Sequence, residues 1–218
     1  MKKILISGIM ALFLIACSST RITSSWKADN LQLKQYKKVL VLGLINDPDR
    51  TIRENMEEQL VSDLEELGYD AVCSCDEFGH KAFEKMNEKE ALAKLSNSSV
   101  DAVLTIVLLD KEKEKYYVPG RVNYSPYSIQ QNRFWGYYNT MYGRVYSPGY
   151  YQTDTRYFWE SNFYDLTHGQ ELLYSVQSQS FEPGTTKTLG HEYGQLIVKD
   201  MLKSNVLVNQ KEVKLKPM

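Results

Sequence analysis

Two continuous apolar runs constrain the fold of this 218-residue chain more than any other feature. Residues 39–44 read Val-Leu-Val-Leu-Gly-Leu, and residues 100–109 are apolar at all but two positions. Neither run alternates between apolar and polar residues, as a strand with one wet face would. The first run therefore predicts a strand that is buried on both faces, and the second predicts another strand, the most apolar one after residue 16.

The residues between these two runs predict helices and a third strand. Residues 50–67 carry one apolar stripe at helical spacing, and Gly68 is a natural helix end. Residues 69–73 form a short strand pattern, and Asn87 with Glu90 resembles a capping box at the start of a second helix. The order strand, helix, strand, helix, strand is typical of βαβ units and a partly parallel sheet. The stripe of the first helix consists of Ile52, Met56, Leu60, Leu64 and Leu67.

The second half of the chain has a different pattern. Residues 156–166 and 171–181 predict a hairpin, residues 187–204 predict an amphipathic helix, and residues 209–218 form a polar tail that we expect to be loose. The predicted fold class is α/β: a single domain over residues 31–208, with a mixed, partly parallel sheet flanked by helices. An irregular Tyr-rich insertion at 116–155 interrupts this domain.

The first 16 residues have the pattern of a targeting signal. Two lysines precede an apolar run that is too short for a bilayer span, which takes about 20 residues. The run ends in Leu14-Ile15-Ala16-Cys17, which resembles the lipobox of bacterial lipoprotein precursors. The resemblance implies cleavage between Ala16 and Cys17 and a lipid on Cys17. Residues 17–30 are then the lipidated cysteine and a polar tether.

A lipid on Cys17 would fix the location of the protein. Several acyl chains on one cysteine bind a membrane firmly, because each buried CH2 group contributes about 0.8 kcal/mol. Ser18 follows the cysteine where inner-membrane retention would favour Asp. In lipoproteins of this type that implies the outer membrane, and we expect a lipid-anchored protein on its periplasmic face. The membrane is therefore a partner only through the lipid.

Tyrosines are concentrated in one segment. Residues 116–164 hold 12 of the 16 tyrosines, and residues 115–153 contain no acidic residue. Tyrosine and arginine are enriched at binding hot spots, and aromatic rings also stack on sugars. The segment could bind an envelope protein, a glycan such as peptidoglycan or a lipid headgroup region, or it could be a loose insertion with no partner. Its candidate surface residues are Arg121, Arg133, Trp135, Tyr137, Tyr138, Arg144, Tyr150 and Tyr151.

Overall charge and compartment argue against nucleic acid as a partner. The chain has 26 Lys and Arg against 27 Asp and Glu, so it has no global attraction to phosphate backbones. An exported protein also works away from nucleic acid.

Cys73 and Cys75 are the only cysteines besides Cys17. On a strand, residues two apart lie about 6.6 Å from each other, near the upper limit for a disulfide. Three interpretations remain open: two semi-buried free thiols, a strained disulfide in an oxidising compartment, and a metal site, which would have too few ligands. We expect no metal and no cofactor.

No catalytic constellation is evident. The histidines are His80, His168 and His191, and none lies in a zinc-protease, nucleophile-elbow or phosphate-loop pattern. Charged residues on the first helix predict a solvated face with local ion pairs. The alternative is a polar site at the carboxyl end of the sheet, which would support a hydrolase. These charged residues are Arg50, Arg53, Glu54, Glu57 and Glu58.

Several segments together resemble a known group of proteins. Residues 36–43, the helix start at Arg50, Arg53 and Glu54, and residues 64–69 and 100–104 are similar to small uncharacterised Gram-negative envelope lipoproteins. Their α/β domain is similar to that of the curli-secretion lipoprotein and to the amino-terminal domain of the Tol-system propeller protein. The resemblance implies this fold class and an envelope role, and it carries over no catalytic residue.

We therefore expect a non-enzymatic, membrane-anchored interaction or assembly factor. The alternatives are a glycan- or ligand-binding lipoprotein that uses aromatic stacking, and a hydrolase of unknown substrate.

Overall fold

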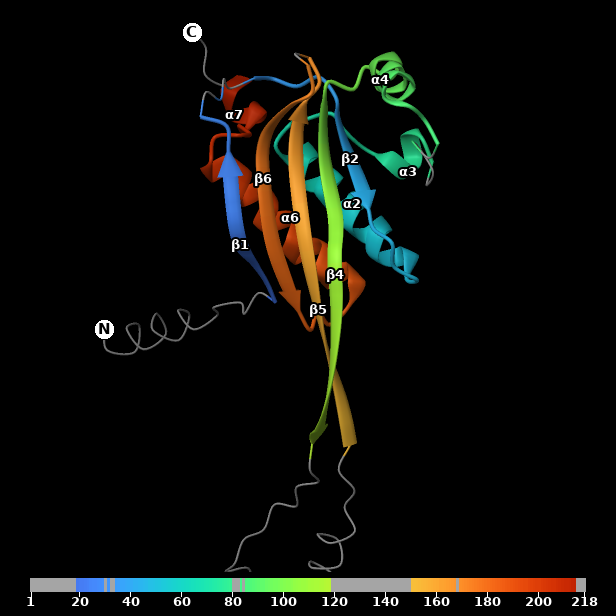
Figure 1. Cartoon of the computed structure of the whole chain (residues 1–218). Coiled ribbons are helices and arrows are strands. Elements are labelled where there is room, and N and C mark those ends of the chain that lie inside the picture. Colours follow the sequence, from blue (N-terminus) through green and yellow to red (C-terminus); the bar gives the residue numbers. More distant parts are fainter. Residues whose placement is uncertain are drawn as a thin grey trace, which may run out of the picture. The chain divides into compact units, whose positions relative to one another are not determined.

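The computed structural model describes residues 19–29, 31, 34–79, 83, 85–118, 150–167 and 169–214 (Figure 1). These residues form two compact units. The first comprises the described residues up to Lys111 and from Arg156 onward, and the second comprises the described residues of Glu112–Thr155.

Six strands of the described residues form one sheet in the order β1-β6-β5-β4-β2-β3. β2 pairs in parallel with β3 and with β4, which aligns Val39 with Ala71 and with Ala102. β6 pairs in antiparallel fashion with both β5 and β1. The predicted α/β class with a mixed, partly parallel sheet is therefore confirmed. The strands are β1 (Thr20–Lys27), β2 (Val39–Leu44), β3 (Ala71–Cys73), β4 (Ala102–Val118), β5 (Tyr150–Asp165) and β6 (Glu171–Phe181).

Two long helices cover one face of this sheet. α2 and α6 lie side by side behind the strands in Figure 1 and belong to one apolar core with them. α4 packs at the opposite face, where its Leu95 joins Leu40 and Val103 in a second, smaller cluster. The helices are α2 (Arg50–Glu66), α3 (Ser74–Glu77), α4 (Glu88–Asn97), α6 (Thr186–Lys203) and α7 (Gln210–Lys214).

β2 is buried from both sides, as its continuous apolar run predicts. Val39 and Val41 point into the core beneath α2 and α6, and both are fully buried. Leu40, between them, points into the cluster with α4 and is also fully buried. Because successive strand side chains alternate between faces, a six-residue strand with no polar side chain needs both of these coverings.

The helices begin where the sequence places capping residues. The side chain of Asp49 accepts a hydrogen bond from the backbone N–H of Thr51 at the start of α2. Asn87 and Glu90 form both bonds of the predicted capping box at the start of α4. Gly68 follows α2 with a φ of 91°, a left-handed conformation that glycine adopts without strain.

Glycines bring α6 very close to α2. A Cβ on Gly190 would lie 2.7 Å from the backbone oxygen of Asn55, and one on Gly194 would overlap Oδ2 of Asp63. Neither position has room for a larger side chain. The contact therefore depends on small residues one helical turn apart on α6.

The predicted tether differs from the structure. Residues 20–27 form β1, an edge strand paired with β6, where a tether was expected over 17–30. Thr20 is buried and its hydroxyl lies 2.9 Å from that of Ser180, whereas Trp26 is exposed. An edge strand with most side chains in water has the composition of a linker, so its own sequence does not reveal the pairing.

The predicted loose tail also differs in part. Residues 210–214 form α7, and Gln210 at its start is buried. The backbone N–H of Gln210 donates to the carbonyl oxygen of Leu67, at the end of α2. A contact of this kind depends on tertiary structure and leaves no periodic signal in so short a segment.

The second unit contains the ends of two strands. Its described residues are Glu112–Val118 of β4 and Tyr150–Thr155 of β5, and the rings of Tyr117 and Tyr151 lie 5.4 Å apart. Both ends of the predicted irregular insertion are thus regular strand, and residues 119–149 lie outside the described residues. Among the described residues, no helix has the length and apolar character needed to cross a bilayer.

The close approach of α6 to α2 makes a stability prediction. Gly190→Ala should lower the free energy of unfolding by about 1–3 kcal/mol, because its methyl group would overlap backbone atoms of α2. Denaturant unfolding of the purified protein measures this. Gly184→Ala is the control, since nothing lies within 4 Å of a Cβ there. Equal stability of the two variants would contradict the helix packing described above.

Candidate functional site

A carboxylate is buried at the carboxyl end of β2. Glu57 of α2 is fully buried. Its Oε1 accepts hydrogen bonds from the backbone N–H of Gly43 at 2.6 Å, from Nε of Arg53 at 2.9 Å and from the hydroxyl of Ser74 at 3.1 Å. A buried charge is tolerated only when it is paired and hydrogen-bonded, and this oxygen meets that requirement.

Local structure explains how Glu57 reaches this position. Glu57 follows Met56 on the buried side of α2, and Arg53 lies one turn earlier, so the two side chains form an i,i+4 ion pair. Gly43 leaves space for the carboxylate, because a Cβ at that position would lie 2.7 Å from Oε1. Nη2 of Arg53 also donates to Ser74, which connects α2 to the segment after β3.

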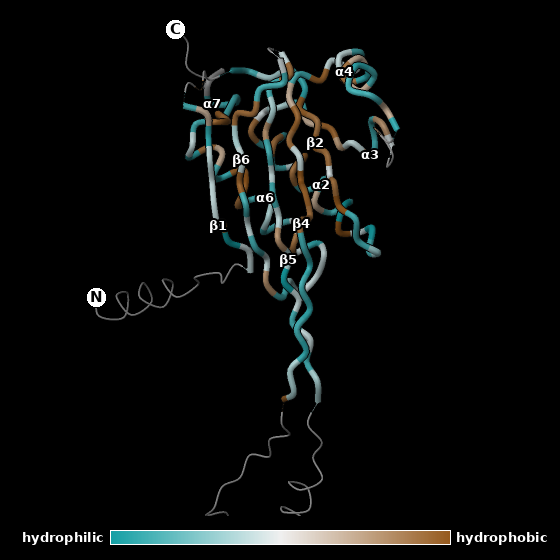
Figure 2. The backbone as a smooth tube through the Cα atoms, viewed as in Figure 1, coloured by the Kyte–Doolittle hydropathy of each residue, from teal (hydrophilic) through white to brown (hydrophobic). Residues whose placement is uncertain are grey.

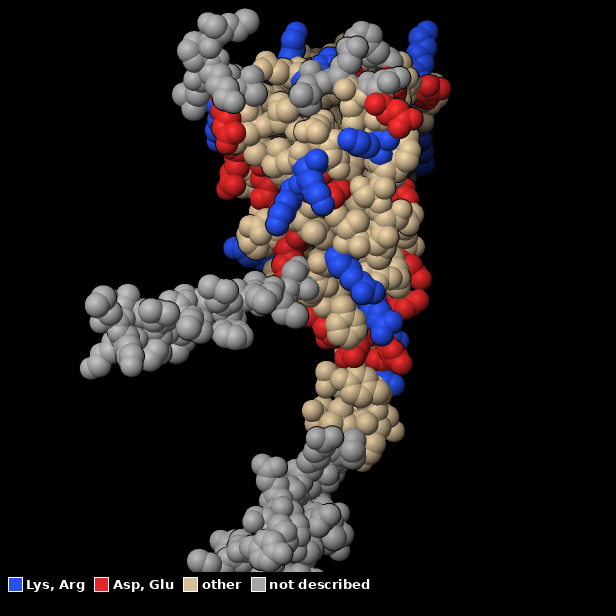
Figure 3. Space-filling model, turned by 90° about the vertical axis from the view of Figure 1, so that its left-hand side faces the viewer, with Lys and Arg blue, Asp and Glu red and all other residues tan. Residues whose placement is uncertain are grey.

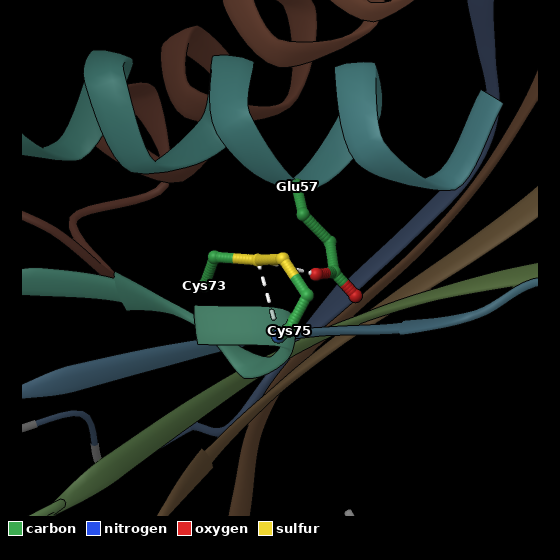
Figure 4. Close-up of side chains that lie close together, drawn as sticks. All are labelled: Glu57, Cys73 and Cys75. Carbon is green, nitrogen blue, oxygen red and sulfur yellow. Dashed lines mark hydrogen bonds between the residues drawn. A yellow bond between two sulfur atoms is a disulfide. The ribbon is translucent and has the colours of Figure 1, made fainter. Parts of the chain in front are cut away.

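Cys73 and Cys75 form a disulfide beside Glu57, so they are not free thiols (Figure 4). Cys73 is the last residue of β3. α3 begins at Ser74, so Cys75 is its second residue. The turn brings their Cα atoms to 5.3 Å, closer than two residues on one extended strand. Sγ of Cys73 lies 2.7 Å from Oε2 of Glu57.

These three residues are also a potential metal-ligand group. One ligand atom from each of Glu57, Cys73 and Cys75 lies within 4.8 Å of the others. Metal ions bind thiolates, and the two sulfurs are joined in a disulfide here. The group could offer thiolate ligands only after reduction.

The charged face of α2 is therefore not uniformly solvated, and that part of the prediction is wrong. Arg50 and Glu58 are exposed, but Glu57 is fully buried and the Arg53 side chain is only 17% exposed. The ion pair connects α2 to β2 and to the segment after β3. A polar cluster lies at the carboxyl end of β2, where the alternative interpretation placed one, and the charges of Arg53 and Glu57 are used in internal bonds.

An apolar groove lies on the sheet face opposite α2 and α6. Its volume is about 360 Å³. Figure 2 shows the hydrophobic colour of β2 and of the adjoining part of β4, which contribute to its floor. α4 covers one part of this face, and Leu44 remains 53% exposed. The lining residues are Leu40, Leu42, Leu44, Phe83, Glu88, Ala91, Leu92, Leu95, Val103, Tyr164, Leu166 and Gln170.

Polar side chains are few at the groove. Nε2 of Gln170 donates to Oε1 of Glu88 at 3.2 Å, so two of the three side chains with polar groups in the lining bond to each other, and Tyr164 is the third. A lining of this kind favours apolar ligands over charged ones.

The side of the molecule that carries β1 has no surface charge of a single sign. Figure 3 shows Lys and Arg side chains there among Asp and Glu side chains.

A more polar hollow of about 720 Å³ adjoins the groove and shares Leu92, Leu95, Leu166 and Gln170 with it. Lys34 lies on its wall and pairs with Asp165 at 3.1 Å. Burial alone would raise the pKa of Asp165, but bonds from Thr167 and Lys34 outweigh burial and lower it. The carboxylate is therefore held in its charged form by its neighbours.

The structure describes two of the residues predicted for the interaction surface. Tyr150 is 59% exposed and Tyr151 is 74% exposed, as side chains available to a partner must be. The other six lie outside the described residues, as do Ala16, Cys17, His80 and His168. The six predicted surface residues that lie outside the described residues are Arg121, Arg133, Trp135, Tyr137, Tyr138 and Arg144.

Comparisons with known proteins give a distant likeness in structure only. No protein-family model matches the chain, and no curated protein matches its sequence. The PelC dodecamer from Paraburkholderia phytofirmans is 11% identical, with a TM-score of 0.41 over 84% of this chain and 94% of that one. Lipoprotein GNA1162 from Neisseria meningitidis is 15% identical, with a TM-score of 0.41 over 77% of this chain and 99% of that one.

A third solved structure is the hypothetical protein CT253 from Chlamydia trachomatis, 8% identical, with a TM-score of 0.36 over 79% of this chain and 96% of that one. The predicted resemblance to the curli-secretion lipoprotein is not confirmed by these comparisons.

The groove was not predicted from the sequence. Its signal is present in Leu40, Leu42 and Leu44, which share one face of a strand predicted to be buried on both sides. The sequence does not show that the element covering this face, α4, has only ten residues and leaves Leu44 uncovered.

The ion pair makes a second stability prediction. Arg53→Met should lower the free energy of unfolding by about 3 kcal/mol, because it leaves the buried Glu57 carboxylate without its guanidinium partner. Chemical unfolding measures the change, and adding Glu57→Gln should recover part of it. Arg50→Met, at an exposed position of the same helix, should change stability by less than about 0.5 kcal/mol. Similar values for both arginine variants would rule out the structural role of Arg53.

Proposed function

We propose that this chain is a membrane-anchored envelope lipoprotein without enzymatic activity, and that its apolar groove binds an envelope protein at the surface of the same membrane. The observation that carries this proposal is the groove of about 360 Å³ on the open face of the sheet, with almost entirely apolar lining. Single exposed apolar residues are ordinary, whereas a hollow with this lining is typical of a binding site.

The distance from the lipid to the folded domain supports a partner at the membrane. β1 begins at Thr20, three residues after Cys17. Three extended residues span at most about 10–11 Å. Ser19 is already fixed, because its N–H and its hydroxyl each donate to Oε2 of Glu192 at 2.7 Å. A domain on so short a connection stays at the lipid headgroups, and its partner must come to the same surface.

The chemistry of the groove selects the kind of partner. Its floor consists of aliphatic strand side chains, and the polar side chains of Gln170 and Glu88 bond to each other. A volume of this size accepts a small number of apolar side chains. The occupant that fits is a short apolar segment of another envelope protein, presented near the bilayer.

The alternatives have less support. Hydrolysis would need free polar groups on α2, and Arg53 and Glu57 are used in internal bonds. Glycan binding rests chiefly on Trp135, Tyr137 and Tyr138, which lie outside the described residues.

The anchor is tested by removing the lipidated cysteine. Cys17→Ala should move the protein from the membrane fraction to the soluble fraction and abolish labelling with radioactive palmitate, because no other residue is expected to carry lipid. Cys75→Ser is a control for cysteine loss and should stay in the membrane fraction. If Cys17→Ala keeps both the label and the membrane location, the anchor proposal is wrong.

The groove is tested by crosslinking in intact cells. A photoreactive amino acid at Leu92 should crosslink the protein to a membrane-fraction protein, and Leu44→Asp should reduce that crosslink at least about tenfold, because a buried charge costs more than 1.4 kcal/mol. Leu109→Asp is the matched control, since Leu109 is 51% exposed and does not line the groove. The absence of any crosslink, or equal loss in both variants, would overturn this assignment.

A further inference from the structure

The two oxygens of the buried Glu57 carboxylate are not equally satisfied. Oε1 accepts from three donors, whereas the contact made by Oε2 among the described residues is with Sγ of Cys73 at 2.7 Å. A sulfur in a disulfide carries no hydrogen, so it cannot donate to this oxygen. In the disulfide form, a fully buried carboxylate oxygen therefore lies against a group that offers no proton.

We propose that Cys73 and Cys75 form a thiol–disulfide exchange site, in which Glu57 stabilises the reduced form by accepting a hydrogen bond from the Cys73 thiol. It reacts with external thiols and disulfides, in a stoichiometric exchange that needs no catalytic turnover. The site is separate from the groove and depends on neither the lipid anchor nor the proposed partner.

The two sulfurs have different access to solvent, which assigns their roles. Cys73 is only 4% exposed and faces Glu57, whereas Cys75 is partly exposed. An external thiolate therefore attacks Sγ of Cys75. Cys73 is the sulfur that leaves, and its position beside the carboxylate is the one where a proton can be held.

The exchange proceeds in two balanced steps. A thiolate bonds to Sγ of Cys75, the bond between Cys75 and Cys73 breaks, and Sγ of Cys73 leaves with the electron pair. Cys73 takes up the proton that the external thiol released to solvent, and its S–H then donates to Oε2 of Glu57. A second thiolate attacks the external sulfur of the mixed disulfide and releases Cys75. Two external thiols are oxidised to one disulfide, and the protein disulfide is reduced to two thiols.

The carboxylate shifts the balance between the two forms. Reduction adds a hydrogen bond to a charged, buried oxygen, and such bonds are stronger than those between neutral groups. A disulfide whose reduced form is stabilised is a stronger oxidant. Glu57 should therefore make this pair easier to reduce than the same pair beside a neutral amide.

The experiment measures the equilibrium of the folded, full-length protein with glutathione. The fraction of reduced protein is determined across glutathione redox buffers by thiol alkylation and mass spectrometry. Wild type should equilibrate without denaturant. In Glu57→Gln, the amide oxygen can still accept from Gly43 and Arg53, and an NH2 group then takes the place of Oε2. The flipped amide would lose those two hydrogen bonds. Half-reduction of this variant should require an about tenfold higher ratio of squared reduced glutathione to oxidised glutathione concentration. This change corresponds to about 30 mV.

Controls separate this role of Glu57 from a structural one. Glu58→Gln changes the same residue type at the next, exposed position and should leave the equilibrium unchanged. Circular dichroism spectra establish that each variant is folded. A disulfide that fails to react in the folded wild type, or an equal midpoint for Glu57→Gln and wild type, would overturn the proposal.

A second pair of variants tests which sulfur is attacked. Cys73→Ser leaves Cys75 without its partner, and Cys75 should then form a mixed disulfide with oxidised glutathione within the folded protein. Cys75→Ser leaves the buried Cys73 and should form it at least about tenfold more slowly, because access limits exchange. Equal rates in the two variants would contradict the assigned roles and with them the site.

Discussion

Burial of β2 on both faces is the constraint on which the rest of the first unit depends. A strand without polar side chains cannot leave either face in water, so one face receives α2 and α6 and the other receives α4. The two helices on the first of these faces lie against each other, and Gly190 and Gly194 of α6 permit that close approach. The groove follows as well, since α4 is shorter than the apolar face that it covers.

The same strand also positions the buried polar cluster. β2 ends at Leu44, and the backbone N–H of Gly43 is directed toward α2, where it binds Glu57. The parallel pairing of β2 with β3 places Cys73 opposite Val41, close to that carboxylate. One strand thus brings together an ion pair, a glycine and a disulfide from three separate segments. The cluster lies on the α2 side of the sheet and the groove on the opposite side.

The sequence predicts the central elements well because their signals are local. The stripe of α2, the Asn87–Glu90 capping box and the continuous run of β2 are each readable within one helix or one strand. β1 and α7 were missed because their support is remote: β1 depends on β6, and Gln210 depends on Leu67. Glu57 was placed in solvent because a helical pattern of charges does not show which member has an internal partner.

By itself, the sequence determined the α/β class, the order of the main strands and helices, and the residues available for chemistry, because hydrophobic periodicity and capping are properties of neighbouring residues. Tertiary structure alone decided that Glu57 lies against the Cys73–Cys75 disulfide and that part of one sheet face stays open. These facts depend on distances between segments that are far apart in the chain. No local pattern encodes such distances, since they are fixed only when the sheet and its helices pack together.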